Sequence, residues 1–163
     1  YIKKMKELER TSEKSNAKRK KLGIIFADIN GLKAANDNYG HEKGDEMIIT
    51  ASTILKTICA TTSQSEKSMD SDSLQRKLKK TNIYRIGGDE FVVITDGIDE
   101  PGFLRKLRLL DSYAASSPEI SFSIGTFWSD GSVGIDEAIR TADDIMYENK
   151  LQYYETHPGK ARR

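Results

Sequence analysis

Residues 83–94 read Ile-Tyr-Arg-Ile-Gly-Gly-Asp-Glu-Phe-Val-Val-Ile, which places a glycine pair between two short runs of β-branched and aromatic residues. This pattern predicts a β-hairpin, because adjacent glycines supply the positive φ angles that many tight turns use. Asp89 and Glu90 follow the glycine pair directly, so the second strand of the hairpin begins with two carboxylates.

The segment before the hairpin is expected to contain a strand and two helices. Residues 22–27 form a nearly continuous apolar run that ends at Asp28, as expected for a central strand buried on both faces. Residues 30–40 predict a short helix closed by Gly40. Apolar residues between positions 47 and 58 then repeat with the spacing of a helix that buries one face.

The segment after the hairpin is expected to contain a helix, a strand and a long last helix. Pro101 opens the first helix, and residues 119–127 alternate between apolar and small polar side chains, which predicts a half-buried strand. An apolar stripe over residues 138–146 marks the last helix. The order β-α-α-β-β-α-β-α predicts an α+β fold, a ferredoxin-like palm with a central antiparallel sheet flanked by helices and one additional helix.

The composition fits one globular domain without disulfides. The chain has 163 residues, which suffices for a single sizeable core, and no internal repeat or second domain is visible. Its only cysteine, Cys59, lies among apolar residues, so we interpret it as part of the core. No apolar run approaches the ~20 residues that cross a bilayer, so no membrane segment is expected in this chain.

Charge and polarity divide the chain into parts. Residues 1–21 contain nine basic and three acidic residues, a net charge of +6 in a chain whose total is +1. We interpret them as a basic, solvated helical lead-in rather than a surface for nucleic acid or anionic lipid. Residues 61–80 form a polar and basic insertion, residues 156–163 a tail, and the domain itself is expected to span residues 22–155.

Two acidic positions are expected to meet at one edge of the sheet. Asp28 ends the first strand and Asp89 follows the hairpin turn, so the carboxylates converge if the hairpin pairs beside that strand. They would repel each other unless a hard cation lay between them, and magnesium with phosphate groups suits such a pair. Taken separately, Asp28 also fits a helix N-cap, and the sequence at 87–89 also fits an ordinary turn.

Residues 85–91, Arg-Ile-Gly-Gly-Asp-Glu-Phe, contain the five-residue signature of the GGDEF diguanylate cyclases, and the chain resembles this family. Similar blocks occur in order over residues 28–45, 123–125 and 142–150, so the resemblance extends from about residue 22 to residue 154. It implies a nucleotidyl cyclase-like palm that condenses two GTP molecules into cyclic di-GMP and pyrophosphate.

The resemblance also implies a metal site. The carboxylate of Asp28, the backbone carbonyl of Ile29 and the carboxylate of Asp89 are expected to hold Mg²⁺, with Mn²⁺ as the other candidate. Asp89 is further expected to deprotonate the attacking hydroxyl. Glu90 is expected close to the reacting groups.

Substrate contacts are implied on the two helices after the first strand and on the last helix. Asn36 and Asp45 match guanine-reading positions, and His41 lies in the same segment. Lys33 and Lys150 match positions that meet triphosphate charge. Each side chain also has a plain structural interpretation: Asn36 as a helix end, His41 and Asp45 as favourable groups at a helix start, and the lysines as solvated side chains.

Family members act in pairs, so a second copy of the domain is the expected partner, together with a sensor or regulatory domain in a parent protein. We expect bacterial second-messenger signalling in the cytoplasm, including the cytoplasmic part of a membrane-anchored parent, and no nucleic-acid partner.

Three departures from the family pattern leave alternatives open. A Gly-Arg-Asn run after the lysine of the last helix is missing, because Lys150 is followed by Leu-Gln-Tyr-Tyr. The inhibitory Arg-x-x-Asp site is replaced by residues 78–81, so product inhibition there is not expected. The family's opening Asp-x-Leu-Thr-Gly-Leu motif is also absent, as in an excised domain. The main alternative is a catalytically weak or inactive GTP-binding regulatory module, and a further one is a palm enzyme for another nucleotide.

Overall fold

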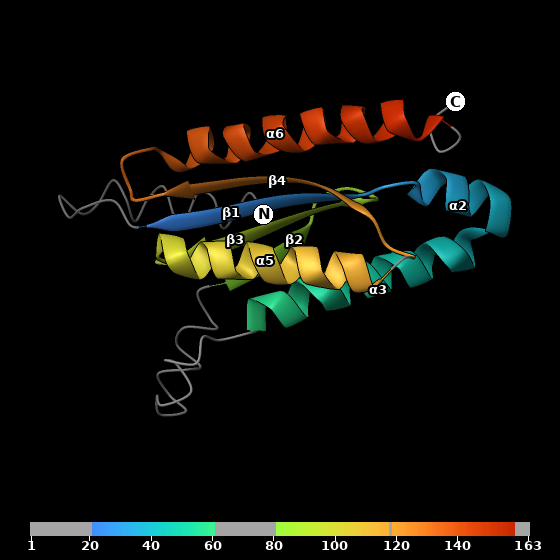
Figure 1. Ribbon diagram of the computed structural model, residues 1–163, viewed down its shortest axis with the longest axis horizontal. Helices are drawn as coiled ribbons and strands as arrows, with labels where there is room; N and C mark the ends of the chain where they lie inside the picture. Colours follow the sequence, from blue (N-terminus) through green and yellow to red (C-terminus); the bar gives the residue numbers. More distant parts are fainter. Residues whose placement is uncertain (1–20, 61–80, 118, 159–163) are drawn as a thin grey trace.

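A computed structural model describes residues 21–60, 81–117 and 119–158, and these form one four-stranded antiparallel sheet with helices on both faces (Figure 1). The strands lie in the order β2-β3-β1-β4, with bounds β1 Leu22–Ile29, β2 Thr81–Arg85, β3 Glu90–Asp96 and β4 Phe122–Ser129. The predicted α+β palm is therefore confirmed. The predicted lead-in helix and the insertion at 61–80 lie outside the described residues.

Three of the described helices cover the sheet, and a fourth lies beyond its end. In Figure 1, α6 lies over one face, α3 and α5 lie over the other, and α2 extends beyond the end of β1. Their bounds are α2 Leu32–Tyr39, α3 His41–Ala60, α5 Glu100–Ser116 and α6 Ile135–Thr156. None of these described helices combines the length and apolarity that crossing a bilayer requires.

β1 is the central strand, and all eight of its residues are buried. Alternate side chains point to opposite faces of a strand. Ile25 and Ile29 accordingly pack into the core beneath α3 and α5, whereas Ile24 and Phe26 pack into the core beneath α6. The apolar run at 22–27 was therefore correctly interpreted as a strand with no solvent-facing side.

Two expectations about local structure were wrong. The helix predicted from residue 30 begins at Leu32, because Asn30 is buried in the loop and Gly31 takes a left-handed φ of 75° before the helix. The strand expected at 119–127 begins at Phe122, and its small-residue face is the more deeply buried one. Ser123 and Gly125 are covered because α6 packs against that face.

The C-terminal end of α3 is tied to α5 by a lysine. The Lys106 ammonium group donates hydrogen bonds to the carbonyl oxygens of Ile58 (3.0 Å) and Cys59 (2.9 Å). A cation at this position satisfies carbonyls that end a helix without intrahelical partners. Burial raises the pKa of the Cys59 thiol to about 11, which agrees with the core interpretation of this cysteine.

At Gly125, the backbone of α6 lies very close to β4. An added Cβ there would lie 1.8 Å from the Ala142 carbonyl oxygen and 2.3 Å from the Met146 nitrogen, both backbone atoms that cannot rotate away. We therefore expect Gly125→Ala to lower the free energy of unfolding by about 2 kcal/mol or more.

Urea unfolding measures this change, with Gly134→Ala as the matched control. Gly134 precedes α6, and an added Cβ there meets nothing within 4 Å. Its replacement should cost at most about 1 kcal/mol through the helix cap. Equal destabilisation by the two variants would contradict the close packing of α6 on β4.

Candidate functional site

The ends of β1 and β3 bring three carboxylates together. Asp28 pairs with Glu90 in the β1–β3 register, and the Ile29 N–H donates a 2.9 Å hydrogen bond to the Asp89 carbonyl oxygen. One carboxylate oxygen each from Asp28, Asp89 and Glu90 lies within 4.8 Å of the others. The predicted convergence of Asp28 and Asp89 is therefore correct, and Glu90 joins them.

The Asp28 side chain is fully buried, and only one of its two carboxylate oxygens has a hydrogen-bond partner among the described residues. Its Oδ2 accepts a hydrogen bond from the Lys150 ammonium group, whereas its Oδ1 has no hydrogen-bond partner among the described residues. Burial raises the pKa of Asp28 to about 6; the Lys150 hydrogen bond opposes this rise, and the charges of Asp89 and Glu90 add to it. A buried carboxylate oxygen without a donor is costly, so this atom is suited to a ligand.

The donor set fits a divalent cation. Hard ions such as Mg²⁺ and Mn²⁺ prefer carboxylate and carbonyl oxygens, and two or three acidic side chains can share one such ion. The unpartnered Oδ1 of Asp28 is an available ligand atom beside Asp89 and Glu90. Lys150 supplies a positive charge to the same cluster.

The glycine turn contributes to the cluster by leaving room for a side chain, not by adopting unusual dihedral angles. Gly87 and Gly88 are not among the described glycines with positive φ, so the predicted reason for the glycine pair was wrong. A Cβ on Gly87 would instead fall 2.5 Å from the Glu90 carboxylate, which lies against the turn. The Arg85 side chain donates two hydrogen bonds, of 3.2 and 2.8 Å, to the Gly88 carbonyl oxygen and so holds the turn.

A buried polar network, which sequence reasoning missed, fixes the loop after β1. The Asn30 amide donates to the Ser121 hydroxyl at 3.0 Å and accepts from the Ser123 hydroxyl at 2.7 Å. Asn and Ser are also common in exposed loops, so no sequence signal distinguishes this network. It holds the backbone of Asp28 and Ile29 in place from the β4 side.

The end of α6 supplies a second contact to the same loop that the sequence did not indicate. The Gly31 N–H donates a hydrogen bond to the hydroxyl oxygen of Tyr154 at 3.2 Å. Lys150 and Tyr154 stand one helical turn apart on α6, so both face the β1–α2 loop.

The interpretation of Asp28 as a helix N-cap is wrong, because Gly31 precedes α2 instead.

The predicted substrate residues lie on α2 and the first turns of α3. Asn36 lies inside α2, which removes its interpretation as a helix end, and a Cβ on Gly44 would fall 2.0 Å from its side-chain oxygen. The two helices therefore meet at this pair, which places Asn36 beside the segment that carries His41 and Asp45. Lys33, His41 and Asp45 are exposed to solvent.

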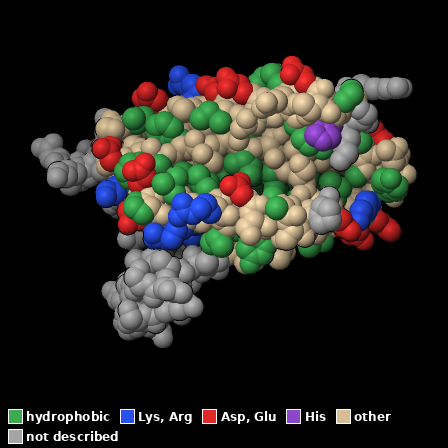
Figure 2. Space-filling view, in the orientation of Figure 1, with side chains coloured by type: hydrophobic (Ala, Val, Ile, Leu, Met, Phe, Trp, Pro, Cys, Tyr) green, Lys and Arg blue, Asp and Glu red, His purple; other side chains and the backbone are tan. Residues whose placement is uncertain are grey.

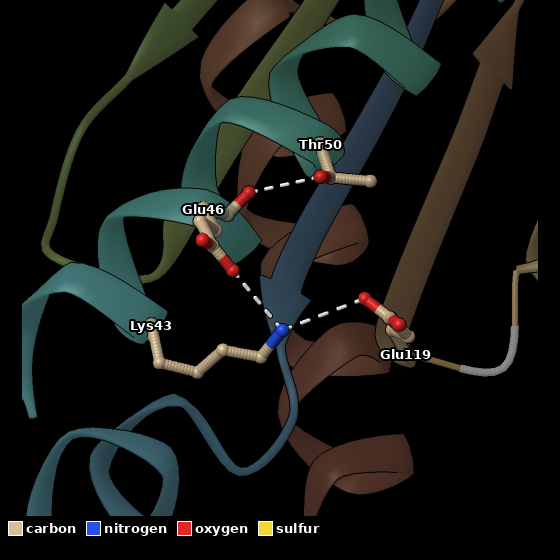
Figure 3. Close-up of polar contacts among 4 residues, drawn as sticks. All are labelled: Lys43, Glu46, Thr50 and Glu119. Atoms are coloured by element: carbon tan, nitrogen blue, oxygen red, sulfur yellow. Dashed lines mark hydrogen bonds and ion pairs between the residues drawn. The ribbon is translucent and has the colours of Figure 1, made fainter. Parts of the chain in front are cut away.

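An exposed lysine links the start of α3 to the chain before β4. Figure 3 shows Lys43 between Glu46 of its own helix, at 3.1 Å, and Glu119, at 3.6 Å. The Glu46 backbone carbonyl accepts a hydrogen bond from the Thr50 hydroxyl at 2.9 Å. Solvent and salt screen such exposed pairs, so this cluster orients the helix start without stabilising it strongly.

A groove in the protein surface lies away from the carboxylate cluster. A groove of about 600 Å³ runs along the outer edge of β4 between α5 and α6, where hydrophobic side chains gather in Figure 2. None of the predicted site residues lines it. The chemistry of the carboxylate cluster, rather than the size of a cavity, identifies the candidate site.

In sequence, the chain is similar to known diguanylate cyclases. The family model described as "Diguanylate cyclase, GGDEF domain" matches residues 4–66. The probable diguanylate cyclase DgcI of Escherichia coli K12 is 29% identical over 127 residues, which are 78% of this chain and 25% of that protein. Diguanylate cyclase DgcS of Shewanella oneidensis is 26% identical over 88% of this chain and 44% of that protein. The chain thus spans less than half the length of these relatives.

Solved structures show the same fold. The active GGEEF domain of a diguanylate cyclase from Vibrio cholerae superposes with a TM-score of 0.62 at 20% identity, covering 81% of this chain and 78% of that one. The GGDEF domain of DgcB from Caulobacter crescentus, solved in complex with c-di-GMP, gives a TM-score of 0.65 at 19% identity, with coverage of 90% and 82%.

The buried Asp28 gives the stability of the protein a defined pH dependence. Its pKa of about 6 lies above the usual 3.8, so the folded protein retains this proton over a pH range in which the unfolded chain has lost it. The contribution of Asp28 therefore lowers the free energy of unfolding as the pH rises from about 4 to about 6.

Asp28→Asn removes this dependence. The free energy of unfolding of the variant minus that of the parent should grow by about 2 kcal/mol between pH 4 and pH 7, since two pKa units correspond to about 3 kcal/mol before solvent screening. Urea unfolding with EDTA present measures the difference. A difference that stays constant with pH would contradict the raised pKa of Asp28.

Proposed function

We propose that the chain is a member of the GGDEF domain family and that it condenses two GTP molecules into cyclic di-GMP, with release of two pyrophosphates. The observation that carries this proposal is the cluster of Asp28, Asp89 and Glu90, in which a fully buried carboxylate oxygen has no donor among the described residues. The names of the relatives point to the same chemistry.

We propose that the carboxylates of Asp28 and Asp89 and the backbone carbonyl of Ile29 hold Mg²⁺ or Mn²⁺, with Glu90 beside them. When bound, the cation neutralises phosphate charge and lowers the pKa of the attacking hydroxyl. Asp28 is the buried anchor of this set, and Lys150 balances its charge before substrate arrives.

Asp89 is the proposed base. It is half-buried, whereas Asp28 is fully enclosed, so Asp89 can reach a bound ribose. It takes the proton of the 3′-hydroxyl of one GTP while that oxygen bonds to the α-phosphorus of the other. The bond from this phosphorus to the bridging oxygen breaks, and pyrophosphate leaves. The same step with the two nucleotides exchanged closes the ring and releases the second pyrophosphate. Lys33 and Lys150 offset the charge on the leaving group.

Guanine recognition is assigned to Asn36 and Asp45, with His41 in the same segment. The packing of Asn36 against Gly44 supports this assignment, because it joins α2 to the turn of α3 that carries Asp45. A carboxylate that accepts hydrogen bonds from the guanine N1–H and amino group would discriminate against adenine, which would leave it unpaired.

The reaction needs two active domains, since each is proposed to bind one GTP. We therefore propose a head-to-head homodimer as the active assembly, with a sensor or regulatory domain of the parent protein controlling it. A bacterial cytoplasm, which contains the GTP substrate, is the proposed location.

A second candidate function is GTP binding without condensation, as a regulatory module. The observation that favours it is the direct contact of Lys150 with Asp28, together with the missing arginine after Lys150. While Lys150 stays on Asp28 it is held away from the phosphates, and the missing arginine leaves fewer cationic side chains to bind them.

Product analysis distinguishes the two functions. The chain, fused to a dimerising coiled coil, is incubated with GTP and Mg²⁺, and the nucleotides are separated by chromatography. We expect cyclic di-GMP from the parent and at least a hundred-fold less, on the order of one removed general base, from Asp89→Asn. The substitution is isosteric and half-buried, so folding should be unaffected, which circular dichroism checks.

Asp96→Asn is the matched control, because this residue lies at the opposite end of β3 and should leave product formation unchanged. GTP binding by calorimetry without any product would favour the regulatory module. Product formation that survives Asp89→Asn would exclude Asp89 as the base.

A further inference from the structure

Lys150 contacts the end of β1, and Tyr154 contacts the loop that follows it. Lys150 contacts the Asp28 carboxylate, and the Tyr154 hydroxyl accepts a 3.2 Å hydrogen bond from the Gly31 N–H. The two side chains project from the same face of α6, because residues four apart on a helix are neighbours. The last turns of α6 therefore face the end of β1, where the proposed metal ligands Asp28 and Ile29 lie, and the loop that follows it.

The ring of Tyr154 is held in a fixed orientation. Tyr153 packs edge-on against it with ring centroids 5.3 Å apart, and Tyr153 itself stacks on His157 at 4.3 Å. A braced ring loses little further freedom when its hydroxyl binds a ligand. This position contrasts with Lys33, which is exposed on α2.

A tyrosine hydroxyl has one proton to donate and two lone pairs to accept with. At Tyr154 one lone pair accepts from Gly31, which leaves the hydroxyl proton for a second partner. An independent feature at the adjoining end of β1 also indicates a ligand, because the buried Asp28 Oδ1 has no partner among the described residues. A cation on that oxygen would arrive with the phosphates it neutralises.

We propose that Tyr154 is a phosphate-binding residue, which donates its hydroxyl proton to a phosphate oxygen of the nucleotide while Gly31 orients the hydroxyl. This inference rests on the proposed function. The sequence has no arginine directly after Lys150, and Tyr154, four residues further along α6, would bind the phosphate through a neutral group instead. A neutral donor supplies a hydrogen bond without a charge, so Lys150 and the metal must balance the phosphates alone.

The test compares the affinities of Tyr154→Phe and the parent for α,β-methylene GTP with Mg²⁺, and for guanosine, by calorimetry. We expect the variant to bind the triphosphate at least about ten-fold more weakly, as for the loss of one hydrogen bond to a charged group. Guanosine affinity should change less than two-fold. Tyr153→Phe keeps the neighbouring ring and removes a hydroxyl outside this loop contact, so both of its affinities should match the parent.

Pyrophosphate binding, followed by the Gly31 amide resonance in NMR spectra, provides the second measurement. We expect pyrophosphate with Mg²⁺ to shift this resonance in the parent and to require several-fold more ligand in Tyr154→Phe. If the parent binds pyrophosphate in this way but not the GTP analogue, the proposed function fails and the role of Tyr154 stands. Unchanged triphosphate affinity in Tyr154→Phe, or an equal loss for guanosine, would overturn the role of Tyr154, as would a Gly31 resonance that no phosphate ligand shifts.

Discussion

The burial of Asp28 is the constraint on which the site depends. The side chain lies at the end of the central strand with no solvent exposure, beside Asp89 and Glu90. Three carboxylates in such a position repel one another, and the enclosed one also loses its hydration. Lys150 offsets part of this cost through Oδ2 and leaves Oδ1 without a partner among the described side chains. The fold thus maintains a negative site that favours a cation.

The surrounding elements hold that site from three sides. The β1–β3 pairing fixes the two acidic strand ends, and the Asn30 network anchors the loop to β4. From α6, Lys150 contacts Asp28 and Tyr154 accepts a hydrogen bond from Gly31. α6 can lie this close because Gly125 presents no side chain toward it. Packing of the last helix and geometry of the site are therefore coupled, although Gly125 contacts none of the acidic residues.

The sequence predicted the elements whose signal is local. The apolar run before Asp28 and the hairpin at 83–94 predicted three of the four strands. The acidic residues were expected to converge if the hairpin paired beside β1, and it does. The burial of Ser123 could not be predicted from its alternating strand, because it depends on the position of α6. The Gly87 contact with Glu90 and the Gly31 contact with Tyr154 likewise join groups whose proximity only the tertiary structure establishes.

The most direct test of a cation-dependent nucleotide site is the pKa of the Asp28 carboxyl group, measured by carbon-detected NMR with and without a ligand. In the metal-free protein this pKa should be about 6, as burial requires. Saturating Mg²⁺ with α,β-methylene GTP should lower it by at least one unit, because a coordinated cation favours the ionised carboxylate. A pKa that remains at about 6 with both ligands present would contradict the assignment of Asp28 as a metal ligand and with it the proposed site.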